Sequence, residues 1–504
     1  MTGLDHPATR RSRRRAAAAG VALLLVVAAC GRDDDASGHD STSTTRAADE
    51  QASTAPTVPA QTRPTTQVQT DDASTTTVAS PSTTAETSDC DAVTLAATDV
   101  GVTADTITIE VMADVGSPLA PGLFQANIDA VEAFADRVNA LGGLACRKLA
   151  VRTWDTKLTP EEALNGQLDA CTNAFALVGG NSLFNPSVTA METCADSTGA
   201  PVGLPDIAAL ANDVNELCSP LTYSIQVVAE RCPVATGHVR PIQAFVGPQR
   251  WLLEHHPGLH GVFAVPGDLP STVQSAMPLI AAQEQTGITF DALVRVSGRD
   301  EQAAYTPRVL AAKTNDSNYF YNGSGDVSMV LARREAAAQG VDVDVWACAL
   351  GCYSQKLLDT GGAIVEGTYV WMQFLPFEEK DTNPELAAYL DSVGADAATS
   401  FGAQAWQAAV LFQTAVNDIV EQHGANGLTR ANLLAALDSI DGFTANGWMG
   451  AKDLKGNSDC FVLLQVQNGQ FVRAFPEERG TLDCDPANIA TVDIDPAAEA
   501  TRIE

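Results

Sequence analysis

The sequence predicts an α/β fold with parallel sheets. Strands and helical stretches alternate along most of the chain, as they do in βα units. Some strands are continuous apolar runs, such as Ala174 to Val178, and such runs suit parallel strands covered on both faces. The segment from Cys90 to about Ile489 is long enough for two lobes with separate cores.

The start of the chain predicts export. Arg10 to Arg15 are a positive region, and Ala16 to Val27 are an apolar stretch too short to span a bilayer comfortably. The small residues before Cys30 resemble a bacterial lipobox. We therefore expect residues 1–29 to be a signal peptide and Cys30 to carry a lipid that anchors the protein to the outer face of the cell membrane. The alternative is an ordinary signal peptide in which Cys30 is incidental.

Residues 30–89 are predicted to be a disordered tether. Ser, Thr, Ala, Pro and Asp dominate this stretch, and it has too few large apolar side chains to offset the entropy of ordering. A flexible chain of this length reaches about 40 Å from the membrane. A cell-wall or glycan-bearing stalk is the alternative interpretation.

Composition and net charge indicate which classes of binding partner to expect for this protein. No second long apolar run follows the leader, so we expect no membrane-spanning segment. The formal net charge of −32 argues against nucleic acid or anionic lipid as a partner.

Ten cysteines remain when Cys30 is removed from the eleven of the chain, and an even number in an exported protein favours disulfides. Their spacing lacks the repeated pattern of a zinc site, so we expect no metal centre and no cofactor. The predicted pairs, taken from sequence neighbours on neighbouring elements, are Cys90–Cys146, Cys171–Cys194, Cys218–Cys232, Cys348–Cys352 and Cys460–Cys484.

The first elements are clear in the pattern. Residues 106–113 alternate as a strand does and end in the turn formers Asp114 to Pro118. Apolar residues at three- and four-residue steps predict a helix from about Phe124 to Leu141. After a strand at residues 148–153, Thr159-Pro160-Glu161-Glu162 predicts a capping box that begins a helix ending near residue 172.

Further strands, separated by helical stretches, are predicted at residues 221–227, 260–265, 291–296, 318–322 and 343–346. The last part differs, because strands at residues 460–467 and 471–475 flank Asn468-Gly469, a type I′ hairpin signal.

The order of these segments resembles that of the type I periplasmic solute-binding proteins of the branched-chain amino acid and amide class, the leucine-binding-like partners of ABC importers. The resemblance covers residues 101–475. Its motifs are Gly101 to Ile109, Val138-Asn-Ala-Leu-Gly-Gly143, Phe175-Ala-Leu-Val-Gly-Gly180, Glu366-Gly-Thr-Tyr-Val370 and Asp453-Leu-Lys-Gly456.

The resemblance implies two doubly wound parallel-sheet lobes joined by a three-crossing hinge, the Venus-flytrap architecture, with a ligand cleft between them. The expected N-terminal lobe is residues 101–220 and 375–440, the C-terminal lobe is residues 221–374 and 441–480, and residues 481–504 are a tail. A monomer that delivers a small-molecule ligand to ABC permease subunits is implied, with ATP hydrolysis left to other subunits.

Ligands in open α/β sheets bind beyond the carboxyl ends of strands, so the loops there are the candidate site. In the first lobe these loops are expected at residues 114–118, 180–183 and 204–208, and in the second at 266–270, 323–326 and 350–353. The candidate ligand-binding residues are Asp114, Ser117, Asn181, Ser182, Leu183, Asp206, Asp268, Ser324, Asp326, Tyr353 and Trp371.

The loop from Gly180 to Leu183 precedes a helix expected to start near Pro186, so its N–H groups and the helix dipole suit an anionic ligand group. In the family, the matching loop holds the ligand carboxylate. A plain βα turn capped by Asn185 is the alternative.

Other loops depart from the amino-acid-binding pattern of the family. Residues 203–209 contain no Ser or Thr, the second-lobe loops lack a tyrosine at the matching points, and residues 349–354 lack the acidic group that pairs with a ligand ammonium. Such an ammonium buried without a counter-charge would cost several kcal/mol, so an ordinary α-amino acid is disfavoured.

Asp206, Asp268 or Asp326 is the candidate replacement for that acidic group, although each also fits a turn or cap. Tyr353 and Trp371 are candidates for stacking on the ligand, and packing between the lobes is the alternative for Trp371.

No sequence motif of an enzyme is present: we find no GxSxG, HExxH or phosphate loop, and His255-His256 fits an exposed helix end. The sequence thus predicts an extracytoplasmic substrate-binding lipoprotein of an ABC importer that captures a small polar organic solute, such as an amino acid-, amide- or aromatic acid-like molecule. A sensing or scaffold lipoprotein on the same fold is the alternative.

Replacing Cys30 by Ser should abolish fatty-acid labelling of the chain, because only the thiol forms the thioether bond to lipid. Growth with a radiolabelled fatty acid measures this, and Ser37→Ala serves as the matched control that keeps the label. Labelling that survives in Cys30→Ser would contradict the lipobox interpretation.

Overall fold

The computed structural model describes residues 90–227 and 242–503, and these belong to one compact unit. The predicted signal peptide, Cys30, the tether and Cys232 lie outside the described residues. Within the described ranges, no helix is both long and apolar enough to cross a bilayer.

The first lobe is built on a parallel sheet with strand order β2-β1-β3-β4-β5. Its strands are β1 (Thr106–Ala113), β2 (Lys148–Asp155), β3 (Ala176–Val178), β4 (Asp206–Ala211) and β5 (Thr222–Val227). Its helices are α1 (Gln125–Ala140), α2 (Pro160–Asn173), α3 (Thr189–Glu192), α4 (Val214–Leu217), α10 (Pro384–Val393), α11 (Ser400–His423) and α12 (Arg430–Ser439).

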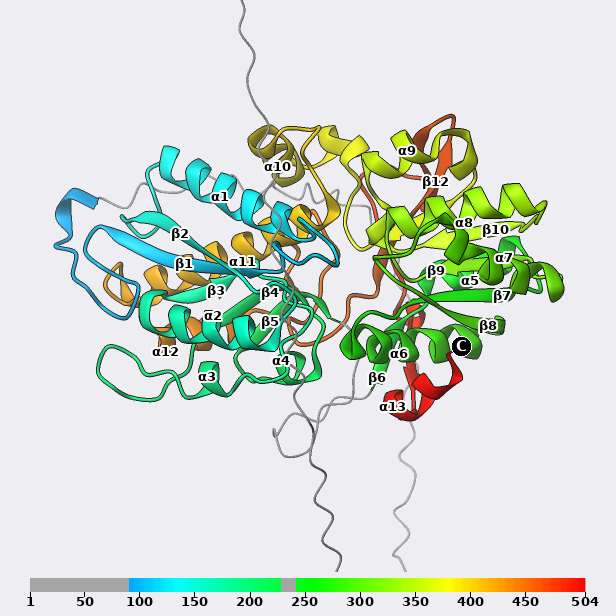
Figure 1. Ribbon diagram of the computed structural model, residues 1–504. Helices are drawn as coiled ribbons and strands as arrows, with labels where there is room; N and C mark the ends of the chain where they lie inside the picture. Colours follow the sequence, from blue (N-terminus) through cyan, green and yellow to red (C-terminus); the bar gives the residue numbers. More distant parts are fainter. Residues whose placement is uncertain (1–89, 228–241, 504) are drawn as a thin grey trace, which may run out of the picture. The chain divides into compact units, whose positions relative to one another are not determined.

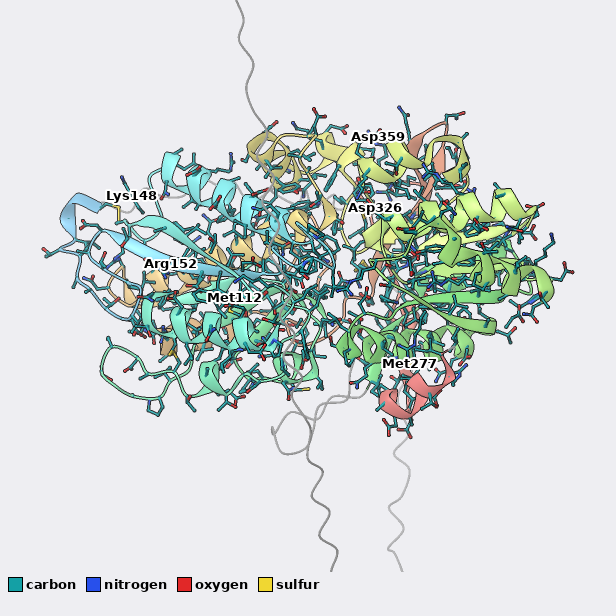
Figure 2. All side chains as sticks on the ribbon, in the orientation of Figure 1. Met112, Lys148, Arg152, Met277, Asp326 and Asp359 are labelled. Carbon is teal, nitrogen blue, oxygen red and sulfur yellow. A yellow bond between two sulfur atoms is a disulfide. The ribbon has the colours of Figure 1, made fainter. Side chains whose placement is uncertain are left out.

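Helices cover both faces of this sheet, as doubly wound folds require. Figure 1 shows α1 and α11 side by side, and they bury one face of the sheet together. Val111 points into that core, whereas its neighbour Met112, labelled in Figure 2, packs with Ala170 of α2 on the opposite face. Ile107, Ile109 and Val111 thus share one core, and Met112 near the end of β1 enters the other.

The second lobe contains a mixed sheet with strand order β13-β12-β11-β10-β9-β7-β8. Strands β7 to β11 pair in parallel, and β12 and β13 are antiparallel. The strands of this sheet are β7 (His260–Pro266), β8 (Thr289–Val296), β9 (Tyr319–Asn322), β10 (Val345–Cys348), β11 (Tyr369–Met372), β12 (Cys460–Gln467) and β13 (Gln470–Phe475), and the lobe also contains β6 (Ile242–Phe245) outside this sheet. The helices are α5 (Gly247–His255), α6 (Pro270–Thr286), α7 (Tyr305–Thr314), α8 (Asp326–Gln339) and α9 (Gln355–Gly361).

Local sequence signals explain two element boundaries. The Thr159 hydroxyl accepts a hydrogen bond from Glu162 N at 3.3 Å, as predicted, but the Glu162 carboxylate binds Lys157 Nζ at 2.9 Å and does not complete the capping box. Asn468 and Gly469 have φ of 53° and 71°, so both central residues of the β12–β13 turn are left-handed, as a type I′ hairpin requires.

The chain passes between the lobes three times, after β5, after β11 and after α12, which confirms the predicted three-crossing hinge. The lobe boundary differs from the expected residue 220, because β5 pairs with β4 and belongs to the first sheet.

Residues 481–504, expected to be a tail, are part of the second lobe over their described length. They contain β14 (Asp483–Cys484), β15 (Ile489–Val492) and α13 (Pro496–Glu499), with β14 paired to β12 and β15 paired to β6. Apolar residues such as Ile489 and Ile503 pack on the core of this lobe, which the sequence analysis overlooked.

Four of the predicted disulfides are present, namely Cys90–Cys146, Cys171–Cys194, Cys348–Cys352 and Cys460–Cys484. The proposed partner of Cys218 is Cys232, which lies outside the described residues, so that pairing stays a prediction.

Arg430, at the start of α12, ties the first lobe together from inside. Its guanidinium is fully buried and donates hydrogen bonds to the carbonyl oxygens of Cys171 at 2.9 Å, Ala195 at 2.9 Å and Phe175 at 3.3 Å. One side chain thereby satisfies backbone groups from α2, the loop after α3 and the segment before β3.

Replacing Arg430 by Met should lower the free energy of unfolding by about 3 kcal/mol or more, because several buried carbonyls lose their donors. Urea unfolding measures the change, and the exposed Arg299→Met is the matched control, expected to stay within about 0.5 kcal/mol. A loss of less than about 1 kcal/mol in Arg430→Met would refute this role for the buried guanidinium.

Candidate ligand-binding site

Asp114 holds together the loops at the carboxyl end of the first sheet. One carboxylate oxygen accepts hydrogen bonds from Thr156 Oγ at 2.6 Å and Leu158 N at 2.7 Å, and the other accepts from Leu183 N at 2.8 Å. Burial raises the pKa of Asp114, while these bonds act in the opposite direction. The carboxylate is committed to the loops after β2 and β3, so it shapes the ligand wall without facing a ligand itself.

Asn181 and Ser182 are buried polar side chains of the first lobe, 1% and 3% exposed, and they line neither of the two hollows described below. Among the described residues, neither the Asn181 amide nor the Ser182 hydroxyl has a hydrogen-bond partner. Gly180 lets this loop pass close to β1, since a Cβ there would lie 2.8 Å from Met112 O. Buried polar groups are nearly always paired in folded proteins, so this loop is suited to a polar partner that completes it.

The predicted helix start near Pro186 is wrong. The first helix after this loop is the single turn α3, beginning at Thr189, so no helix dipole points at Asn181 or Ser182. Asn185 is not its cap either, because its Oδ1 accepts a hydrogen bond from Gln167 Nε2 at 2.7 Å.

The lobes contact each other through loop carbonyls. Leu183 O accepts a hydrogen bond of 2.6 Å from Ser271 Oγ on α6, and Leu350 O in the second lobe accepts one of 3.0 Å from Ser400 Oγ on α11. Both bonds join the carboxyl-end loops of one lobe to a helix of the other, where hinge closure brings the two lobes together.

A hollow of about 210 Å³, here called the aromatic chamber, lies at the carboxyl ends of the second-lobe strands. Gln226 of β5 closes its first-lobe side. Phe245 and Trp371 pack there with ring centroids 4.9 Å apart. Its lining includes Gln226, Phe245, Phe263, Pro266, Leu279, Trp371 and Gln373.

A smaller hollow of about 10 Å³, here called the amide niche, adjoins the aromatic chamber and shares Gln226, Trp371 and Gln373 with it. Its lining also includes Gln404 and Gln407 of α11, together with Ile225, Leu350, Phe374 and Met449. Gln404 and Gln407 are 3% and 1% exposed, and Gln404 Oε1 and both amide atoms of Gln407 have no hydrogen-bond partner within the described part of the chain. The side-chain amides of Gln404 and Gln407, from the first lobe, therefore lie near the ring of Trp371, from the second lobe, where the two hollows adjoin.

Of the predicted ligand-binding residues, Trp371 lines both hollows and Asn181, Ser182 and Leu183 form the loop described above. Several of the others are occupied by local contacts. Ser117 Oγ accepts from Leu119 N at 3.2 Å, and Asp268 accepts from Ser297 Oγ at 2.6 Å and Gly298 N at 2.7 Å.

Tyr353, Asp326 and Ser324 also have structural partners. The Tyr353 hydroxyl donates to Glu378 at 2.6 Å and accepts from Phe377 N at 2.7 Å. Asp326, labelled in Figure 2 at the start of α8, accepts from Ser354 Oγ at 2.8 Å. Ser324 lies against Gly351, where an added Cβ would be 3.3 Å from the Ser324 carbonyl oxygen. None of these three residues is among the residues lining the two hollows.

Asp206 is not in a carboxyl-end loop, and that expectation is wrong. It is the first residue of β4, 4% exposed, and its carboxylate accepts from Thr222 Oγ1 at 2.9 Å. Burial raises its pKa to about 7, and also raises the pKa of its buried neighbour Glu216. The two acids form a buried pair at the far end of the strand from the ligand loops.

Sequence reasoning missed Gln226, Phe245, Gln404 and Gln407. Polar residues at positions 404 and 407 are one helical turn apart within an otherwise apolar helix, which is the one signal that was available. Gln226 lies near the end of β5, and in the sequence it looks like an ordinary polar residue at the end of a strand.

Two further features do not qualify as this site. An open hollow of about 400 Å³ lies on the second lobe beside α5 and α6, lined by residues such as Arg250 and Glu254, and none of its lining residues belongs to the carboxyl-end loops. Asp459, Cys460 and Cys484 lie close enough to share a metal ion, but the two sulfurs are joined as a disulfide and offer no thiolate.

Stability should fall as pH rises from about 4 to about 7, and Asp206→Asn should remove part of this dependence. The folded chain holds the Asp206 proton more tightly than the unfolded chain, with a pKa of about 7 against 3.8, so the stabilising effect is complete below 3.8 and lost above about 7. Urea unfolding across this range measures it, with the exposed Asp105→Asn as control. A difference between Asp206→Asn and the parent that is constant with pH would contradict the assignment.

Comparisons with known proteins agree with this architecture. A family profile described as periplasmic binding protein matches residues 106–470. No curated protein sequence matches the chain.

Three solved structures illustrate the likeness. A leucine-binding protein from Thermotoga maritima shares 13% identity with a TM-score of 0.56, over 76% of this chain and 99% of that chain. A fatty acid ABC transporter substrate-binding protein from Thermomonospora curvata shares 18% identity with a TM-score of 0.56, over 79% and 96%. An ABC transporter solute-binding protein from R. palustris in complex with benzoate shares 14% identity with a TM-score of 0.56, over 73% and 95%.

At such low identities these likenesses show the fold alone, and the ligands named for the three proteins differ from one another. The family profile, in contrast, spans most of both lobes. The chain therefore belongs to the periplasmic binding protein family, in its type I, leucine-binding-like branch, whose members are extracytoplasmic substrate-binding proteins and not enzymes.

Proposed function

We propose that this protein is the lipid-anchored substrate-binding component of an ABC importer. It captures a small polar organic solute between its lobes and delivers it to a permease. The observation that supports this most is that the aromatic chamber and the amide niche share Gln226, Trp371 and Gln373, so that first-lobe amides and second-lobe aromatic rings line neighbouring hollows.

The polar groups left without partners support the same proposal. An unpaired buried polar group costs about 1–3 kcal/mol, a cost that a ligand or water molecule removes. Gln404 and Gln407 have such groups among the described residues, and both are contributed by the first lobe and line the amide niche. A solute that pairs with them in the closed form therefore favours closure through its differential affinity for that form.

The closed pair of lobes is the form presented to the permease. The contacts of Leu183 with Ser271 and of Leu350 with Ser400 are made only when the lobes meet, so they mark this form. A lipid on Cys30 and the tether keep the monomeric domain near its permease, at a reach of about 40 Å.

A thermal-shift screen over amino acids, amides, urea, aromatic acids and short peptides tests the binding function. A true ligand present at 100 times its Kd stabilises the protein by about 2.7 kcal/mol, and small-angle scattering should show compaction with the same compound. The variant Gln226→Ala, at a position that lines both hollows, should bind it at least tenfold more weakly, whereas the exposed control Asn315→Ala should bind it unchanged. No stabilisation and no compaction with any compound would overturn the proposal.

Measuring uptake of the solute by cells distinguishes a component of an importer from a sensing or scaffold protein. Cells that lack this chain should lose uptake of the identified ligand and regain it with the parent protein. Unchanged uptake, together with intact binding in vitro, would instead support a sensing or scaffold lipoprotein on the same fold.

A further inference from the structure

The lining of the proposed site is uncharged. Among the described residues, no Asp, Glu, Lys, Arg or His lines either the aromatic chamber or the amide niche. The buried ammonium of Lys452 lies beneath β5, but it donates to the carbonyl oxygens of Ser224 at 2.7 Å and Ile225 at 2.8 Å. A charged ligand group here would be desolvated without an opposite charge in the lining, which is strongly unfavourable.

The aromatic chamber fits a compact apolar body. A cavity of about 150 Å³ lined by apolar side chains holds a benzene molecule. The chamber, at about 210 Å³, therefore has room for one ring or a short branched chain with a few further atoms. Phe245, Phe263 and Trp371 supply flat faces for such a body.

The amide niche, at about 10 Å³, has room for one water-sized group, such as a terminal nitrogen or oxygen atom of the same molecule. Gln404 Nε2 donates to Gln226 Oε1, and Gln373 Nε2 donates to Ser458 O at 2.9 Å, so these donors are already committed. What is left is the acceptor Gln404 Oε1 and both the donor and the acceptor of Gln407. A ligand group that both donates and accepts satisfies these atoms, whereas a carboxylate offers no donor to Gln404 Oε1.

We propose that the solute is uncharged, with a compact ring or branched apolar body in the aromatic chamber and a carboxamide-like group whose terminal atoms reach the amide niche. This rests on the proposed function and names the class of solute. Gln226, Trp371 and Gln373 line both hollows, so the polar end of a molecule in the chamber lies beside the niche.

Three pairs of probes of equal shape test the charge preference: benzamide with benzoate, isovaleramide with isovalerate, and phenylacetamide with phenylacetate. Calorimetric titration of the mature chain at neutral pH should show at least one amide binding ten times or more tightly than its acid. An acid that binds as tightly as its amide overturns the inference while leaving the proposed function standing. Absence of binding by all six probes also overturns it, and the proposed function fails as well only if the wider screen finds no ligand.

Variants of α11 test where the polar end of the solute binds. Gln407→Met should weaken the binding amide at least tenfold while leaving the binding of toluene, an apolar probe of the aromatic chamber, unchanged. Gln404→Met should act in the same direction, and the exposed Gln355→Met is the matched control with no effect. Retained toluene binding shows that the chamber is folded in each variant. Unchanged amide affinity in both Gln407→Met and Gln404→Met contradicts the assignment.

Discussion

The buried carboxylate of Asp114 is the contact on which the ligand wall of the first lobe depends. It stands at the end of β1 and accepts hydrogen bonds from the loops after β2 and β3, so three separate strand ends are held in one arrangement. Asp114 also accepts from Leu183 N, and the neighbouring Asn181 and Ser182 side chains have no partners among the described residues.

The same loop connects the wall to lobe closure. Leu183 receives support from Asp114 through its N–H and contacts Ser271 of the other lobe through its carbonyl oxygen. A second contact, from Ser400 to Leu350, lies beside the amide niche, which Leu350 also lines. Closure and ligand contact therefore involve the same short segments, as expected where a solute stabilises the closed form.

Much of the fold could be predicted because the burial of side chains determines the order of apolar and polar residues in strands and helices. The alternating pattern of β1, the apolar runs of β3 and β7 and the helix signals around α1 and α2 identified these elements, and the cysteine neighbours gave four correct disulfides. Asp206 was misplaced because an acid beside Pro205 looks like a turn, while tertiary pairing with Leu177 and Thr222 makes it the start of a strand. The final segment was overlooked because its strands are short.

The site was less predictable, since a residue's role there depends on which partners the fold supplies. Asp268, Asp326 and Tyr353 have side chains that suit ligand binding, but neighbours far away in sequence occupy them. The helical spacing of Gln404 and Gln407 was a weak signal in the sequence, but their lack of partners among the described residues is seen only in the fold.

Hydrogen–deuterium exchange with a ligand from the screen tests the central claim most directly, because it locates binding along the whole chain. The account predicts slower exchange both in the loop around Asn181 to Leu183 and in the hinge strands at Gln226 and Trp371. Protection confined to the open hollow beside Arg250 and Glu254, with no change at these segments, would contradict capture between the lobes.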